Sequence, residues 1–188
     1  MRLVAESRRE PIVPSGVLGM LIFVFTEGMV FAGLISAFII IRAQAILWPP
    51  PGQPRLPIEE TALNTAALLL SGLTLYWAKR RFRRDPRSAL RPLLATVLLG
   101  SFFVCFQGVE WVRLIGEGLT MTSSALGSFF YLIVGLHALH AVVAIGLLVY
   151  VYVRLRQGWL SAGSLASAEV LWYFVVGVWP VLFLVVYR

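Results

Sequence analysis

The chain has 188 residues, of which 59% are hydrophobic and 13% are charged, and its formal net charge is +7. Soluble domains carry about 25% charged residues, so this composition excludes an ordinary water-soluble domain and indicates a protein that lies in a lipid bilayer. The positive charge does not indicate a nucleic-acid partner, because much of it lies in one short stretch, 79–91, between apolar segments.

Five apolar segments are long enough, or nearly so, to cross the membrane as helices. A helix needs about 20 mainly apolar residues to cross ~30 Å of hydrocarbon. Open strands are excluded, because lipid gives their edges no hydrogen-bond partners. The sequence therefore predicts an all-α membrane protein with five transmembrane helices, at residues 17–41, 61–78, 92–112, 126–153 and 167–187.

The segment between the first two predicted helices, 48–57 (WPPPGQPRLP), is expected to be a non-helical loop. Its prolines lack the amide hydrogen that a helix needs, and their rings clash with the preceding turn. Tryptophan favours the level of the lipid headgroups. We therefore expect four tryptophans to act as anchors at the membrane interface: Trp48, Trp111, Trp172 and Trp179.

Lysine and arginine are divided unevenly between the two sides of the predicted bundle. The N-terminal tail, the 79–91 loop and the 154–166 loop carry 3, 7 and 2 of them, which makes 12. The opposite side carries 4, at Arg42, Arg55, Arg113 and Arg188. Because cytoplasmic loops hold the excess of these residues, we expect the N-terminus in the cytoplasm and, with five helices, the C-terminus outside.

Glu27 lies almost at the centre of the first predicted helix, where a carboxylate is costly in hydrocarbon. Two interpretations are open: a neutral, hydrogen-bonded acid that holds two helices together, or an acid that handles protons or contacts lipid. His137 and His140 share one face of the fourth helix, and His137 lies ~16 Å from Leu126 by helical rise. Similar depths make a hydrogen bond between Glu27 and one of these histidines possible.

Haem or metal binding by these residues is not favoured. Two histidines on one face cannot take both sides of a single haem. A metal cluster of Glu27, Glu110, His137 and His140 is conceivable, but Glu110 lies ~27 Å along the third helix, near the outer surface. There we expect Glu110 to pair with Arg113, one turn later.

Polar side chains within the other spans are expected to bridge helices. Polar groups in lipid need partners on neighbouring helices, and the residues concerned are Gln107, Asn64, Thr65, Ser71 and Thr74. The chain has no nucleophile–base pair, phosphate loop or nucleotide fingerprint. The sequence therefore predicts interhelical hydrogen bonding and no catalytic centre in this chain.

In order along the chain, several stretches resemble subunit III of the haem-copper oxidases, the family of cytochrome c oxidase and quinol oxidase subunits, in its short five-helix form. A glutamate in the first helix, WPP, LNT, Q-x2-E and H-x2-H are specific when they occur together. The resemblance covers nearly the whole chain, in FTEGMVFAGLISAFII (25–40), WPPPG (48–52), ALNTAALLLSGLTLYWA (62–78), LGSFFVCFQGVEW (99–111), FYLIVGLHALHAVVAIG (130–146) and LWYFVVGVW (171–179).

The resemblance implies one transmembrane domain over 1–188, a multi-pass subunit of the bacterial inner membrane. It implies two helix groups splayed into a V with phospholipid in the cleft. It also implies no redox centre here, with haem and copper in the partner subunits. Subunit I is the expected direct partner and subunit II belongs to the same complex, in which this subunit stabilises subunit I and supports its proton uptake.

By position, Glu27 matches the family's carbodiimide-reactive acid. His137 with His140 matches the H-x2-H pair, and Gln107 with Glu110 matches the Q-x2-E motif.

The last helix departs from the family pattern W-H-F-x-D-x-x-W. Trp172, Phe174 and Trp179 are kept, but Tyr173 replaces the histidine and Val176 the aspartate. This departure leaves the homologous subunit of nitric oxide reductases, or of another respiratory complex, as an alternative. A haem anchor and a small transporter are further alternatives, although few polar residues are available to line a path through the membrane.

Overall fold

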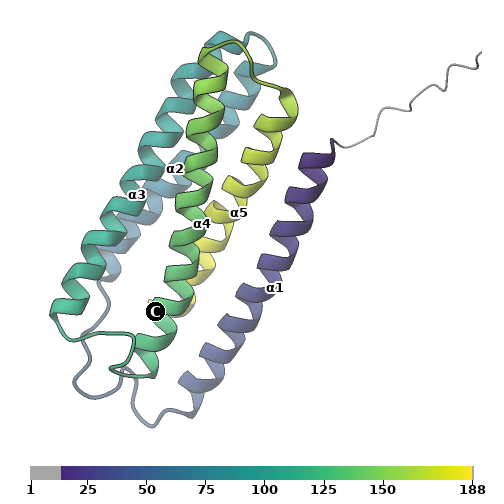
Figure 1. The fold of residues 1–188 in the computed structure, drawn as a ribbon. Coiled ribbons are helices and arrows are strands. Elements are labelled where there is room, and N and C mark those ends of the chain that lie inside the picture. Colours follow the sequence, from purple (N-terminus) through teal and green to yellow (C-terminus); the bar gives the residue numbers. More distant parts are fainter. Residues whose placement is uncertain (1–13, 188) are drawn as a thin grey trace, which may run out of the picture.

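A computed structural model describes residues 14–187, so the N-terminal tail with its three predicted cytoplasmic arginines, and Arg188, lie outside the described residues. The described part is all-helical and contains five α-helices (Figure 1). A short 3-10 helix, η1, precedes α3. Their bounds are α1 Ser15–Gln44, α2 Ile58–Phe82, η1 Pro86–Ala89, α3 Leu90–Gly116, α4 Ala125–Arg156 and α5 Ala162–Val186.

Local capping sets several of these bounds, and the helices therefore extend a little beyond the predicted apolar segments. Ser161 accepts a hydrogen bond from the amide of Ser164, so α5 begins at Ala162, five residues ahead of the predicted 167. Ser124 caps α4 in the same way. Gly118 and Gly158 follow α3 and α4 with φ of +94° and +78°, a left-handed conformation that glycine adopts without a steric cost.

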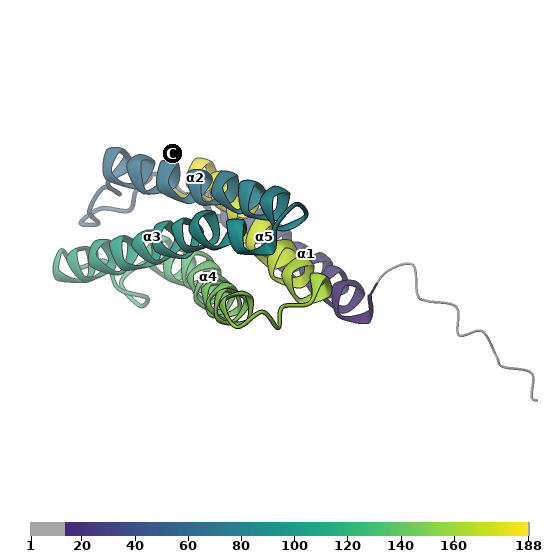
Figure 2. The ribbon, with the colours of Figure 1, turned by 90° about the horizontal axis from the view of Figure 1, so that it is seen from above.

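The helices run up and down in one bundle, with α1 at its edge (Figures 1 and 2). Helix α2 packs along α3 and α5, and α4 packs between α3 and α5. Helix α1 packs along α5 and, to a lesser degree, α4, and within residues 14–187 its backbone does not approach α2 or α3. The start of α1 lies at the same end of the bundle as the α2–α3 and α4–α5 connections.

Four helical segments in the described part are long and apolar enough to cross a membrane: Ser15–Gln44, Pro86–Gly116, Ala125–Arg156 and Ala162–Val186. Helix α2 is less apolar, because Glu59 and Glu60 occupy its first turn and Lys79 to Arg81 its last. Buried polar residues lower its hydropathy further. Four of the five predicted spans therefore meet this requirement, and α2 is a helix of the bundle that does not.

Two of the expected interface anchors lie in the middle of the bundle instead. Trp172 and Trp179 are fully buried. The Nε1–H of Trp172 donates to Ser71 Oγ at 3.1 Å, and that of Trp179 donates to Thr65 Oγ1 at 2.8 Å. Because a buried indole N–H needs an acceptor, hydroxyls on α2 draw both rings into the interior, which corrects the prediction for these two residues.

The other two expected anchors are only partly buried. The ring of Trp48 lies 5.6 Å from that of Phe38, and the ring of Trp111 lies 5.7 Å from that of Tyr131. Both tryptophans lie towards the end of the bundle that holds the α1–α2 and α3–α4 connections. Their role at a membrane interface remains a prediction.

Trp172 fits the bundle only because α3 has a glycine opposite its ring. A Cβ at Gly100 would lie 2.4 Å from Trp172 Cη2, whereas one at Gly108 would meet nothing within 4 Å. Gly100→Ala should therefore lower the free energy of unfolding by about 1–3 kcal/mol, since the buried ring must move. The measurement is thermal or denaturant unfolding of the purified chain, monitored by circular dichroism.

Gly108→Ala is the matched control on the same helix, where loss of a glycine should be neutral or slightly stabilising. Equal stability of the two variants would contradict the packing described for Trp172.

Candidate functional site

A buried polar cluster joins α2, α3 and the end of α5. Tyr187 Oη donates to Glu110 Oε1 at 2.8 Å, and Thr61 Oγ1 lies 3.0 Å from Glu110 Oε2. Gln107 Nε2 donates to Tyr187 Oη at 3.1 Å. Glu110 is only 3% exposed, so its carboxyl depends on these partners rather than on water. We call Thr61, Gln107, Glu110 and Tyr187 the Glu110 cluster.

The contacts of Glu110 correct the expectation that it pairs with Arg113. Arg113 Nη1 instead lies 3.1 Å from Glu60, and its Nε lies 3.0 Å from Glu117. Helical rise gave the depth of Glu110 along α3 but not the side on which it lies. Glu110 shares a face of α3 with Gln107 and Leu114, and that face is buried in the bundle.

Asn64 and His137 lie in the next layer of the bundle. Asn64 Nδ2 donates to the backbone oxygen of Phe103 at 3.2 Å and joins α2 to α3. The ring of His137 lies 5.0 Å from that of Trp179 and 6.1 Å from that of Phe103, with an exposed fraction of 1%. Within residues 14–187 neither ring nitrogen of His137 has a hydrogen-bond partner. An imidazole in this position packs as an aromatic ring.

Glu27 meets His140 rather than His137. His140 Nε2 lies 3.2 Å from Glu27 Oε2, and His140 Nδ1 lies 2.7 Å from the backbone oxygen of Leu136. A carbonyl oxygen only accepts, so Nδ1 carries a hydrogen. The Glu27–His140 pair joins α1 to α4 through a carboxyl and an imidazole.

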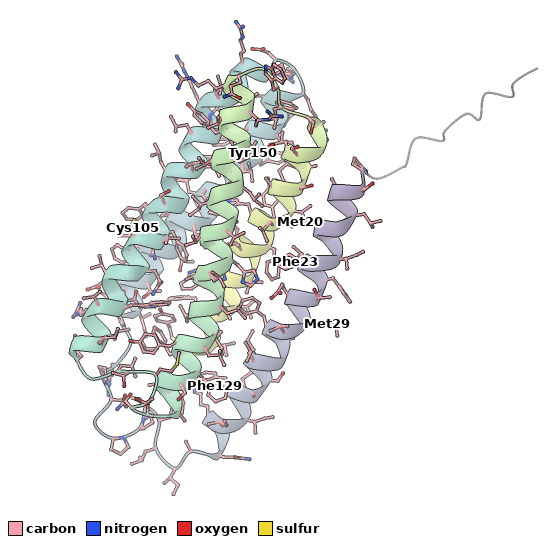
Figure 3. All side chains as sticks on the ribbon, viewed as in Figure 1. Met20, Phe23, Met29, Cys105, Phe129 and Tyr150 are labelled. Carbon is pink, nitrogen blue, oxygen red and sulfur yellow. The ribbon has the colours of Figure 1, made fainter. Side chains whose placement is uncertain are left out.

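Aromatic rings surround this contact between α1 and α4. Phe23 and Phe31 on α1 have ring centroids 6.0 Å and 5.7 Å from that of His140. Phe23 is labelled in Figure 3 between Met20 and Met29 along α1, and Met29 is 63% exposed. The side chain of Glu27 keeps 22% of its surface exposed. The pair thus lies at the edge of the bundle and the Glu110 cluster lies inside it.

Sequence reasoning missed three residues of these polar contacts. Thr61 lies beside Glu110. Tyr187 completes the Glu110 cluster, and it lies on the same face of α5 as Trp179, eight residues earlier. Glu169 is buried near the other end of the bundle, where its Oε2 lies 2.5 Å from Lys79 Nζ. A carboxylate within an apolar segment, with a lysine directly after the second predicted span, was the available signal.

The two positions that depart from the family pattern lie on the side of α5 that faces outwards beside α2. Tyr173 is 37% exposed. Val176 packs against α2 so closely that a Cβ at Gly72 would lie 3.2 Å from its Cγ1. Among the described side chains, no three from histidine, cysteine, aspartate and glutamate come together as metal ligands would.

Comparison with known proteins points to the same family as the sequence motifs. The family model described as cytochrome c oxidase subunit III matches residues 6–188. The chain belongs to this family.

Individual relatives agree with the family match. The chain is 33% identical to the "Probable cytochrome c oxidase subunit 3" of Nocardia farcinica, over 90% of this chain and 86% of the relative. The protein of the same name in Mycobacterium leprae is 36% identical over the same shares of the two chains. The "Cytochrome c oxidase subunit 3" of Latimeria chalumnae is 33% identical over 94% of this chain and 70% of the relative. The resemblance inferred from the sequence is confirmed.

The Glu110 cluster should be sensitive to the loss of one hydroxyl. Tyr187→Phe removes the group that joins Glu110 to Gln107 and leaves a buried carboxyl one partner short. We expect the free energy of unfolding to fall by about 1–3 kcal/mol in chemical denaturation. Tyr150→Phe is the control, because Tyr150 is 51% exposed. Equal effects of the two changes would contradict the role given to Tyr187.

The contact between α1 and α4 should distinguish two replacements of Glu27. Glu27→Gln keeps an N–H that can donate to His140 Nε2, whereas Glu27→Leu removes every polar group from that side. We expect Glu27→Leu to cost about 0.6–1.7 kcal/mol relative to Glu27→Gln, the range of hydrogen bonds between membrane helices. Unfolding in mixed micelles measures the difference, and two variants of the same stability would contradict the contact.

Proposed function

We propose that the chain is the non-catalytic subunit III of a bacterial aerobic haem-copper terminal oxidase, in the cytoplasmic membrane. The match of the subunit III family to residues 6–188 carries the proposal. In this role the chain binds subunit I directly and shares a complex with subunit II, and those partners hold the haem and copper. The relatives reported above are named for the oxidase, which favours it over the nitric oxide reductase alternative.

In this proposal the whole chain is one transmembrane domain and α2 is its fifth span. Residues 62–78 of α2 carry no charged side chain, and its charges gather at the two ends. Its polar residues face neighbouring helices, as Asn64 faces α3 and Ser71 faces α5. A helix whose polar groups are satisfied inside a bundle can cross lipid at lower mean hydropathy than an isolated one.

The positive end of the bundle faces the cytoplasm in this proposal, with the C-terminus outside. Lys79 to Arg91 lie at or near the α2–α3 connection, and Arg154 and Arg156 lie at the end of α4. Both sets are at the end of the bundle where α1 begins (Figure 1). This common location supports the orientation expected from the excess of cationic residues.

The family's V-shaped arrangement would here have α1 on one side and α2 with α3 on the other. The packing of α1 on α5 and α4 alone supports this division. Between α1 and α2, at the start of α5, lies a cavity of about 390 Å³ lined by Pro14, Val17, Ala166 and Lys79, among others. We propose that phospholipid occupies the opening.

The polar contacts have a positioning role in the proposal. The Glu110 cluster, Asn64 and the packed ring of His137 fix α2, α3, α4 and α5 as one body, whereas Glu27 and His140 attach α1. Such a body presents fixed apolar faces to subunit I and stabilises it. The acid–imidazole pair of Glu27 and His140 is the feature of this chain that fits a link to proton uptake.

Co-purification tests the proposal. We expect the affinity-tagged chain, extracted in mild detergent, to bring down a large haem-bearing subunit whose spectrum has a Soret band. An untagged strain processed in parallel is the control. Recovery of the chain alone would contradict the role in a complex. A Soret band that remains with the chain after it is separated from its partners would contradict the non-catalytic assignment.

A further inference from the structure

One face of α2 is exposed over most of the length of the helix. Side chains on this face follow one another at steps of three, four or seven residues, which places them in one line along the helix. The line is apolar until its last two members, which are arginines at the end of α2 that faces the cytoplasm in the proposed orientation. We call it the α2 stripe, and it consists of Leu63, Leu70, Leu73, Trp77, Arg80 and Arg84.

The cationic end of the α2 stripe has no acidic partner among residues 14–187. Arg80, Arg81 and Arg84 line a cavity of about 360 Å³ beside the ring of Trp77, and none of them forms an ion pair within that part of the chain. The next acid along the chain, Asp85, accepts hydrogen bonds from two backbone amides at the start of η1. Three exposed guanidinium groups therefore share one surface, and the described residues give them no counter-charge.

The N-terminal tail of this chain, or a second copy of the chain, does not fit these arginines. Residues 1–13 contain three arginines and two glutamates, so their own net charge is positive. A second copy in the same membrane orientation would bring the same arginines together at the cytoplasmic end. Its exposed carboxylates Glu59, Glu60 and Glu117 lie at the opposite end of the bundle. The complementary acids therefore belong to a different molecule.

The spacing of the cations fits carboxylates on a helix better than separate lipid headgroups. The helical turn continues to Arg84, whose amide donates to the backbone oxygen of Arg81, so Arg80 and Arg84 lie one turn apart. Side chains one turn apart have Cβ atoms ~5–6 Å from each other on any helix. Two carboxylates at that spacing can pair with both guanidinium groups at once, each through two N–H···O bonds. Lipid headgroups are not linked to one another, so each would have to be ordered separately.

We propose that the α2 stripe binds a transmembrane helix of another subunit, whose cytoplasmic end carries two carboxylates one helical turn apart. The apolar side chains of that helix pack on the leucines of the stripe, at the spacing with which helices pack along each other. Its two carboxylates pair with Arg80 and Arg84 beside the ring of Trp77. This contact specifies a partner within the complex, so it rests on the proposed function and on its membrane orientation.

Photo-cross-linking in the assembled oxidase identifies what covers the stripe. The variant Leu73→p-benzoylphenylalanine places the reactive group on the stripe, and Leu98→p-benzoylphenylalanine on α3 is the matched control, because the two leucines are 55% and 61% exposed. We expect position 73, and not position 98, to cross-link to a transmembrane segment with two acids three or four residues apart at its cytoplasmic end. A segment without such acids, the same segment from both positions, or lipid adducts alone would overturn the assignment.

Charge substitutions test the cationic end separately. Arg80→Gln with Arg84→Gln should weaken retention of the cross-linked subunit about five-fold in washes of rising NaCl concentration, the effect of losing two exposed ion pairs. Arg87→Gln with Arg91→Gln removes the same charge from the neighbouring η1 and α3 and should change retention little. All four arginines are exposed, so both double variants should keep the thermal unfolding of the unchanged chain. Equal losses from the two pairs would contradict a specific contact.

A charge reversal makes the test independent of any general effect on assembly. Arg84→Glu should release the subunit, and changing its facing acid to arginine should restore most of the retention. Absence of that restoration would overturn the pairing. If Arg80→Gln with Arg84→Gln instead lowers the bound anionic phospholipid and leaves every subunit in place, lipid occupies the surface and the proposal falls.

The same preparations separate this inference from the proposed function. If haem-bearing subunits are recovered with the chain and position 73 gives the expected cross-link, both stand. If those subunits are recovered and the stripe cross-links only to lipid, only the helix contact falls. A chain that is recovered alone removes the proposed function and, with it, the partner proposed for the stripe.

Discussion

Two hydrogen bonds between α5 and α2 are the constraint on which the rest of the bundle depends. A buried indole N–H in a lipid-embedded protein has no water to meet it, so Trp172 and Trp179 need acceptors from a neighbouring helix. Ser71 and Thr65 supply them, and each hydroxyl also donates to a carbonyl of its own helix. Both groups are thereby satisfied, and the facing sides of α2 and α5 are fixed.

The positions of the other polar contacts depend on these two hydrogen bonds between α5 and α2. Once Trp179 faces α2, its ring forms one wall for His137, and the next turns of α5 bring Tyr187 to Glu110. Helix α3 packs against the ring of Trp172 at Gly100, because a side chain at position 100 would clash with that ring. Membrane helices gain little from burying apolar surface, since lipid is equally apolar. Close packing and satisfied polar groups therefore determine which helices are neighbours.

The sequence predicted the helices well and their faces poorly, for a physical reason. The length of an apolar segment is set by bilayer thickness and can be read directly, which is why the five helices cover the predicted ranges to within one residue. The side that each helix turns inwards is set by its partners. The two buried tryptophans were therefore misplaced and Glu110 was given the wrong partner, although the depth argument correctly brought Glu27 near a histidine. Capping serines act through local hydrogen bonds and Tyr187 acts through a hydrogen bond to α3, and hydropathy registers neither.

Helix α1 is held less firmly than the other four helices, because it lies at the edge of the bundle. Four helices share one interlocked interior, whereas α1 is joined to α4 and α5 by ring contacts, by the hydrogen bond from Arg42 to Val185 O and by one partly exposed acid–imidazole pair. Harsh detergents compete for such exposed apolar edges before they reach an interior of this kind. Solubilisation should thus loosen the N-terminal helix while the remaining four stay assembled. A preparation can then look folded by its helical content and still have lost the helix that carries Glu27.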